Sequence, residues 1–257
     1  MALSLQDVVQ NLPLGKGVKV LAIHPSGLIA LEKPHGVLSH PNVEVDRRRS
    51  LLNASWSKDR ERYAWKIGDG SERLYLLHRL DAATSGVILA CLNQDLARAL
   101  KKEFSKRNVS KTYRAVVSGM ARKSDTLWKD HLRKRKIGSQ LRVDANVRGG
   151  ALAETRVKLV QVKQSKPMLS LLEFNPITGR THQLRVQSAK RNMPILGDST
   201  YGNFQFNRDI QKVIGNQRLF LHSASIYISW IWEDTEYTFE AKSDTPEIFK
   251  QVMELKI

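Results

Sequence analysis

The stretch LHRLDAATSGVILAC, residues 77–91, is the segment around which we expect the fold to be organised. Its second half, from Val87 to Cys91, is apolar and rich in β-branched or small residues, as a buried strand is. Asp81 would then lie on a loop that leads into a rigid element, two residues after Arg79. A carboxylate placed there can act as base, nucleophile or metal ligand, and arginine offers a planar set of donors to phosphate or carboxylate. A plain ion pair on a surface loop would have the same pattern, so the rest of the chain must separate the two interpretations.

The charge balance is the most unusual property of the composition. Among 257 residues, 42 are Lys or Arg and 25 are Asp or Glu, which gives a formal net charge of +17. A hydrophobic content of 41% is ordinary for a folded chain of one large domain or two small ones. A positive field of this size attracts polyanions, so we expect nucleic acid as the partner.

Several other function classes lack their sequence signatures. No apolar stretch has the length of a membrane span, and the N-terminus lacks the pattern of a secretory signal. We therefore expect a cytoplasmic monomer without membrane contact, in which the single cysteine, Cys91, is a small buried hydrophobic residue. Dinucleotide-binding, P-loop, zinc-deaminase and nucleophile-elbow motifs are also missing. His35 and His40 have no third ligand at a recognisable spacing, so we expect neither a metal nor an organic cofactor.

The remaining pattern predicts short strands with few helices. We expect strands over residues 28–32, 112–117, 151–162 and 168–174, the last two forming a hairpin. Helices are expected from a cap at Asp95 to about residue 108, from a cap at Thr181, and from Pro246 to the C-terminus. Residues 1–26 read as a lead-in, residues 119–150 as a basic loop region, and the segment after residue 219 as closing strands. No linker or internal repeat marks a domain boundary.

Two basic segments are candidates for contacts with the phosphates of a nucleic acid. Between residues 46 and 75, basic residues alternate with aromatic ones, which suits phosphate contact and base stacking, or equally an exposed loop with aromatic anchors in the core. We expect phosphate contacts from two runs of cations: Arg47, Arg48 and Arg49, and Arg133, Lys134, Arg135 and Lys136.

Four separated motifs resemble the pseudouridine synthases of the RluA type. They are residues 29–40 around a Lys-Pro-His-Gly turn, residues 78–86, the sequence KTYRA at 111–115, and residues 178–185 with 194–202. Their order and spacing agree with that family, which isomerises uridine in RNA without a cofactor. The resemblance implies an α+β pseudouridine synthase fold, with a mixed, mostly antiparallel sheet, flanking helices and a central basic cleft. It implies one catalytic domain over residues 27–257, with two subdomains around the cleft and no S4-type RNA-binding domain.

The resemblance also implies roles for particular residues. Asp81 matches the essential aspartate, which the family's chemistry describes as nucleophile or as base. Tyr113 matches the tyrosine that stacks on the target base, and Arg185 the arginine that pairs with the aspartate. Arg79 would lie beside the flipped nucleotide, filling the gap or gripping its phosphate. Further substrate contacts are expected from four residues: His78, Arg180, His182 and Leu221.

Local departures and rival functions remain open from the sequence. Gln187 stands where relatives often have histidine, Asn192 where they often have glycine, and Ser223 where alanine is usual. Taken singly, Tyr113 could be a core-facing strand residue and Arg185 a solvated helix charge. A catalytically inactive RNA-binding or ribosome-assembly protein would keep the same fold and charge, and a nucleoside hydrolase would release free uracil. Of the functions considered, we expect pseudouridine formation in structured ribosomal or transfer RNA.

Overall fold

The chain folds into two compact units, and the backbone passes from one to the other within or beside strands. The computed structural model describes residues 4–121, 125–138 and 140–255. The first unit comprises Met1–Val109 with Ser225–Ser243, and the second Ser110–Ala224 with Asp244–Ile257. The divisions fall at the start of strand β7 (Val109–Ser118), within strand β12 (Leu221–Trp232) and just after strand β13 (Thr235–Lys242). Because the two units are divided within or next to strands, no Gly-rich or Pro-rich linker marks the division in the sequence.

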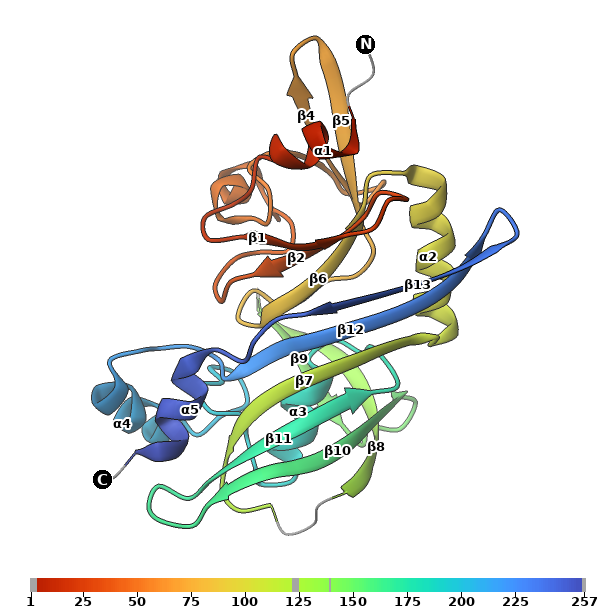
Figure 1. Cartoon of the computed structure of the whole chain (residues 1–257). Coiled ribbons are helices and arrows are strands. Elements are labelled where there is room, and N and C mark those ends of the chain that lie inside the picture. The colour runs from red at the N-terminus through yellow and green to blue at the C-terminus, as the bar shows by residue number, and fades with distance from the viewer. Residues whose placement is uncertain (1–3, 122–124, 139, 256–257) are drawn as a thin grey trace. The chain divides into compact units, whose positions relative to one another are not determined.

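The first unit is an antiparallel sheet with one long helix. Its strands run β3-β4-β5-β6-β12, with β2 also on β6, β1 on β2 and β13 on β12. The helix α2 packs against β5 and β6 (Figure 1). The remaining elements of this unit have these bounds: α1 Leu5–Gln10, β1 Lys19–Ile23, β2 Leu28–Lys33, the 3-10 helix η1 Glu44–Arg49, β3 Ser55–Ser57, β4 Arg62–Ile67, β5 Gly70–Leu76, β6 Ser85–Cys91 and α2 Gln94–Lys106.

The strand β6 is the centre of this unit, as the sequence predicts. All seven of its residues are buried, because β2 and β5 flank it and α2 packs against it. Its apolar side chains join those of α2 and β12 in one core cluster. The helix α2 is confirmed, but its cap is Asn93, whose side chain accepts hydrogen bonds from the amides of Asp95 and Leu96. Asp95 therefore lies inside the helix, and the prediction that it caps the helix is wrong.

The expected lead-in over residues 1–26 carries regular structure. The helix α1 begins with a capping box, in which Ser4 and Asp7 each accept a hydrogen bond from the other's backbone amide. The strand β1 follows and pairs antiparallel with β2. Six residues are too few for a clear helical period, and this is why α1 does not stand out in the sequence.

The second unit is an antiparallel sheet of order β7-β11-β10-β8-β9 with three helices. The predicted hairpin is confirmed by the pairing of β10 with β11, and the strand expected over residues 112–117 is β7. Figure 1 shows α3 beside the strands β8 to β11. The remaining elements have these bounds: β8 Asp125–Ile137, β9 Gln140–Ala145, β10 Ala151–Lys163, β11 Leu169–Pro176, α3 Gln183–Lys190, α4 Phe204–Ile214 and α5 Glu247–Glu254.

Within the basic region over residues 119–150, the strands β8 and β9 pair antiparallel, so the prediction of a loop is wrong for these two segments. Trp128, Asp130 and Leu132 are buried on one face of β8, while Lys129 and His131 between them are exposed. This is the alternation of a strand with one buried face, but a buried aspartate among many cations hides it in the sequence. No helix among the described residues has the length and apolar character that crossing a membrane requires.

Candidate active site

Asp81 lies on the loop between β5 and β6, and a buried lysine holds this loop. Lys33 ends β2 and is 0% exposed. Its ammonium donates hydrogen bonds to three carbonyl oxygens, those of Pro34 at 3.0 Å, Val37 at 2.6 Å and Ala82 at 3.1 Å. A buried ammonium is costly unless its donors are satisfied, so Lys33 ties the residue after Asp81 to the turn that follows β2.

The same turn also binds the loop on the other side of Asp81. The hydroxyl of Ser39 donates to the carbonyl of Leu80 at 2.8 Å and accepts from the amide of Leu80 at 3.0 Å. The Nδ1 atom of His35 lies 2.7 Å from the carbonyl oxygen of Ala83. Neighbours on both sides of Asp81 are therefore fixed, while its own side chain is only half-buried.

Aromatic residues from the segment between residues 46 and 75 support this turn. Tyr63 is fully buried and donates from its hydroxyl to the carbonyl of Ser39 at 2.8 Å. Burial raises the pKa of this phenol, so it remains a donor. Trp56 stacks on His40, with ring centroids 4.8 Å apart, and also contacts Tyr63. These aromatic residues are anchors of strands β3 and β4 and belong to the support of the Asp81 loop.

Two residues of the HRLD motif, His78 and Arg79, have different surroundings. His78 is half-buried, where its Nε2 atom accepts the amide hydrogen of Leu89 at 3.0 Å and its ring stacks on Phe104. Arg79 is exposed, and its Nη1 atom lies 3.1 Å from Nε2 of His40. His78 therefore serves the fold of the loop, whereas Arg79 presents its guanidinium to the surface. His40 and His35 each contact a different partner, and the described residues contain no group of three His, Cys, Asp or Glu that could hold a metal ion.

Arg185 lies on α3 and is 6% exposed, so it is not a solvated helix charge. Its Nε and Nη2 atoms donate to the two carboxylate oxygens of Asp198, at 2.8 and 2.9 Å, and Nη2 also donates to Thr200 at 3.1 Å. Burial by itself would raise the pKa of Asp198, but the hydrogen bonds and charge of Arg185 hold that pKa below its usual value. The buried guanidinium is thus fixed on one side by a bidentate ion pair.

The beginning of α3 differs from the predicted one. The cap position is His182 with a left-handed φ of 53°, and no side chain caps the helix there, so the prediction that Thr181 caps it is wrong. The side chain of Gln183 organises the turn instead, because its Oε1 atom accepts from the amide of Arg180 at 2.9 Å and from Thr178 at 2.7 Å. The guanidinium of Arg180 bonds the carbonyl of Leu152 at 3.1 Å, near the protein surface.

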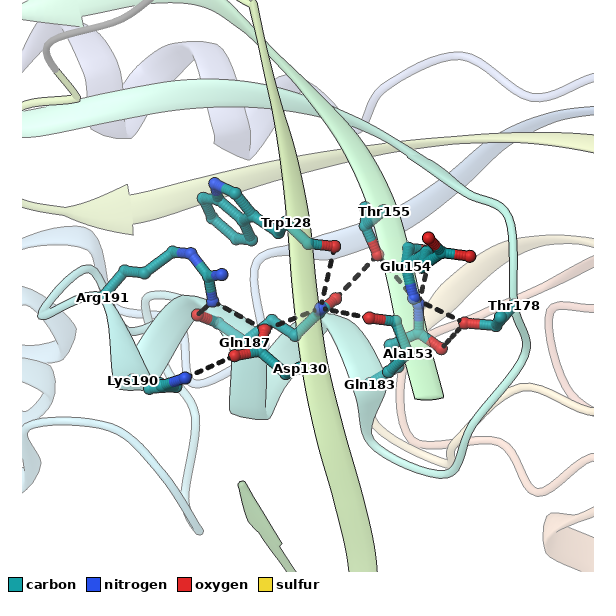
Figure 2. A network of polar contacts seen from close by, with 10 residues as sticks. All are labelled: Trp128, Asp130, Ala153, Glu154, Thr155, Thr178, Gln183, Gln187, Lys190 and Arg191. Atoms are coloured by element: carbon teal, nitrogen blue, oxygen red, sulfur yellow. Dashed lines mark hydrogen bonds and ion pairs between the residues drawn. The ribbon is translucent and has the colours of Figure 1, made fainter. Parts of the chain in front are cut away.

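A buried polar network fastens α3 to the sheet, as Figure 2 shows. The side-chain amide of Gln187 donates to Asp130 at 2.9 Å and to the carbonyl of Ala153 at 3.2 Å, and it accepts from the hydroxyl of Thr155 at 2.7 Å. Lys190 also bonds Asp130, at 2.6 Å. Because these groups are satisfied by one another, the glutamine that departs from the family pattern fits its buried site without an unpaired donor.

Tyr113 and Leu221 lie on two other strands of the second unit. Tyr113 shares a face of β7 with the buried residues Ala115 and Val117, but it is itself half-buried. Leu221 is buried at the start of β12. Tyr113 therefore lies at the partly exposed end of a core-facing row.

The two predicted sets of phosphate-binding cations have different surroundings. In η1, Arg47 pairs with Glu44 at 3.5 Å and Arg49 lies 4.0 Å from Asp46, so carboxylates partly offset these charges. The run Arg133–Lys136 is exposed on β8, and Arg135 faces Arg142 directly across the hairpin. Like charges directly opposite on paired strands repel, and an anion between them would relieve the repulsion.

Sequence reasoning missed four residues that shape this site: Lys33, Ser39, Asp198 and Tyr201. Lys33 and Ser39 lie in the first motif, where a lysine after an apolar strand and directly before a proline is the available signal. For Asp198 the signal is weaker, since a carboxylate after a glycine is common in loops. Their roles depend on contacts with residues between 13 and 58 positions away in the chain.

Comparison with known proteins identifies relatives over most of the chain. A family model described as RNA pseudouridylate synthase matches residues 27–190. A tRNA pseudouridine synthase C of Yersinia pestis is 33% identical over 230 residues, which is 85% of this chain and 84% of that protein. A ribosomal large subunit pseudouridine synthase C of Rickettsia bellii is 32% identical over 236 residues, 90% of this chain and 70% of that protein.

Solved structures support the same fold. Human RNA pseudouridylate synthase domain containing 1 superposes with a TM-score of 0.62 at 19% identity, over 93% of this chain and 96% of that one. Human RNA pseudouridylate synthase domain containing 4 gives a TM-score of 0.61 at 22% identity, over 91% of each chain. The predicted α+β fold with a mostly antiparallel sheet is confirmed.

Proposed function

The chain belongs to the RNA pseudouridylate synthase family, and from this premise we propose that it isomerises uridine to pseudouridine in RNA, with Asp81 as the catalytic group. The observation that carries the proposal is the position of Asp81 within the matched region, on a loop whose neighbouring residues are fixed by Lys33 and Ser39. A carboxylate held on a rigid loop and half-exposed is placed to meet a substrate.

The reaction breaks the bond between N1 of uracil and C1′ of ribose and forms a bond between C5 and C1′. N1 gains a proton and C5 loses one, so the exchange requires no oxidant, reductant or cofactor. The carboxylate of Asp81 either attacks the nucleotide as a nucleophile or removes a proton to begin elimination. Both routes need an ionised carboxylate, and neither needs a metal.

Arg185 and Tyr113 complete the proposed catalytic group. We infer that Arg185 supports Asp81 in the reaction, as the family resemblance implies. Its bidentate bond to Asp198 supports this role, because that bond fixes the orientation of the guanidinium. Tyr113, which is half-buried on β7, is proposed to stack on the target uracil.

The proposed substrate is structured RNA, either transfer or ribosomal. The net charge of +17 and the exposed cations of β8 support binding to a polyanion. The relatives reported above bear the names of enzymes for both RNA classes. We propose that four residues contact the nucleotides around the target: Arg79, Arg180, His182 and Leu221. His78 stabilises the loop, because it accepts the amide hydrogen of Leu89.

The proposal is tested by changing Asp81 to Asn, which preserves size and removes the charge. Pseudouridine mapping on total RNA from cells with and without the protein first names the modified site. On that RNA, Asp81→Asn is expected to lower the rate by about 10²–10⁴-fold, with RNA affinity unchanged. Asp95→Asn, on the exposed side of α2, is the matched control and should keep the wild-type rate.

Three outcomes would contradict the proposal. Activity retained in Asp81→Asn would exclude Asp81 as the catalytic group. A protein that binds RNA and supports cells equally well with Asp81→Ala would be an RNA-binding protein of the same fold without activity. Release of free uracil, detected by chromatography, would identify a hydrolase instead.

A further inference from the structure

Tyr201 contacts three different parts of the second unit. Its hydroxyl oxygen accepts the amide hydrogen of Val143 at 2.8 Å and lies 2.9 Å from Nδ1 of His182. Its ring lies under the guanidinium of Arg185, 5.3 Å from the ring centroid. One side chain therefore joins strand β9, the first turn of α3 and the buried arginine.

Val143 places the first of these contacts in the basic hairpin. It lies on β9 directly opposite Lys134, so the neighbouring residues on β8 are the exposed cations Arg133 and Arg135. Val143 itself is buried with Leu132 in a small apolar cluster, against which Tyr201 packs. The phenol thus holds the backbone of the hairpin at the level of its cationic run.

The backbone of Tyr201 belongs to the loop that holds Arg185. The amides of Tyr201 and Thr200 both donate to Oδ1 of Asp198, at 3.0 and 2.8 Å. That same oxygen accepts from Arg185 at 2.9 Å. A shift of Tyr201 would therefore move the carboxylate that orients the guanidinium, besides moving the ring beneath it.

Binding of RNA is expected to change the geometry of the hairpin. Arg135 and Arg142 face each other across β8 and β9, and two guanidinium groups directly opposite repel. Phosphate between them would remove the repulsion and draw the strands into a different spacing or twist. The amide of Val143 lies one residue from Arg142, so such an adjustment reaches the hydroxyl of Tyr201 directly.

We propose that Tyr201 is a positioning residue that transmits the placement of the RNA-bound β8–β9 hairpin to Arg185. RNA held by the hairpin would then orient the arginine for the reaction, which favours reaction on correctly docked RNA. The catalytic consequence rests on the function proposed above, whereas the mechanical link between hairpin and α3 does not depend on it. A purely structural tyrosine would stabilise the unit equally with and without RNA.

The decisive variant is Tyr201→Phe. It keeps the ring beneath Arg185 and in the apolar cluster, and it removes only the hydroxyl with its contacts to Val143 and His182. Tyr227→Phe is the matched control, because Tyr227 is exposed on β12 in the part assigned to the first unit. Both variants are compared with the wild type by hydrogen exchange, with and without unfractionated tRNA.

In the wild type and in Tyr227→Phe, tRNA is expected to slow exchange in residues 183–190 as well as in the hairpin. In Tyr201→Phe the hairpin should remain protected, while the RNA-dependent protection of residues 183–190 falls by about threefold or more. Equal protection of α3 in all three proteins would overturn the proposal. It would also be overturned by a wild type in which tRNA protects the hairpin alone, or protects neither segment.

Single-turnover kinetics on the mapped substrate RNA separate this proposal from the proposed function. At saturating RNA, Tyr201→Phe is expected to react about tenfold more slowly, with affinity for RNA within about twofold of the wild type. If the wild type made no pseudouridine but Tyr201→Phe still lost the RNA-dependent protection of α3 that the wild type shows, the function would be rejected and the link kept. Normal turnover and normal protection in Tyr201→Phe would reject the link and keep the function.

Discussion

Asp81 in the first unit and Arg185 in the second, the two charged groups proposed to act in catalysis, are held by different means. Around Asp81, main-chain groups of Leu80, Ala82 and Ala83 are bound, and the carboxylate itself is half-exposed. Around Arg185, side chains bind the charge itself, and the guanidinium is buried. The carboxylate proposed to react is thus placed through its backbone, whereas the arginine proposed to assist it is bound directly by side chains. Substitution of Asp81 should therefore change the unfolding free energy little, whereas disruption of the ion pair of Arg185 should lower it strongly.

The largest expected effect is that of removing the carboxylate that pairs with Arg185. Asp198→Ala leaves a buried guanidinium without its bidentate partner, and removing one member of a buried pair costs about 3–5 kcal/mol. Urea denaturation of the variant should show a loss of unfolding free energy of this size. Asp209→Ala is the control, because Asp209 is exposed on α4 and bonds only the side chain of Gln205 among the contacts seen. A loss below about 1 kcal/mol in Asp198→Ala would mean that Arg185 finds another anion.

Lys33→Met tests the other side of the comparison. Methionine has a similar length but cannot donate, so the carbonyl oxygens of Pro34, Val37 and Ala82 lose a buried donor. We expect a loss of about 3 kcal/mol in unfolding free energy and a lower turnover rate with RNA affinity retained. Lys19→Met, exposed on β1, should change neither quantity. If Lys33→Met lowered stability alone, the Asp81 loop would not need this lysine for its working position.

The buried carboxylate Asp130 predicts a pH dependence of stability. Burial by itself would raise its pKa, but bonds from Lys190, Gln187 and Arg191 hold the pKa below the ordinary value near 3.8. Because the folded pKa is depressed, the contribution to stability is complete above the unfolded pKa and is lost as pH falls through the folded one. Asp130→Asn should therefore unfold with a weaker pH dependence than the wild type below about pH 4. Identical slopes in acid denaturation would contradict the charge-assisted network under α3.

The smallest effect concerns the repulsive pair on the basic hairpin, and its two consequences have opposite signs. Arg135→Gln should stabilise the protein by a few tenths of a kcal/mol, since Arg142 loses a like charge across the strands. The same change should reduce the slope of log affinity against log salt for RNA by about 1. Arg98→Gln, whose arginine pairs with Asp95 on α2, is the control for both measurements. An unchanged salt slope in Arg135→Gln would remove Arg135 from the phosphate contacts.

The sequence predicted elements best where one local pattern dominated. The apolar run of β6, the alternation in β7 and the hairpin β10–β11 are all confirmed. The strands β8 and β9 were missed because a buried aspartate and a dense run of cations mask the alternation of a half-buried strand. The helix α4 was also missed, although Asn203 caps it and Gly215 ends it in the left-handed region. Its short amphipathic pattern follows directly after a loop rich in turn residues, which weakens the signal.

The candidate site shows the same division between local and distant information. The family, the carboxylate proposed to react and the basic character of the protein are all indicated by short motifs and composition, because they depend on which residues are present. The grip of Asp198 on Arg185, the three carbonyls around Lys33 and the contact of Tyr201 with Val143 are set by the tertiary structure alone. Those contacts join residues up to 58 positions apart. At such separations, no periodic pattern in the sequence indicates which donor will meet which acceptor. Folding brings them together by burying apolar surface, and the polar partners follow from the requirement that buried donors and acceptors be paired.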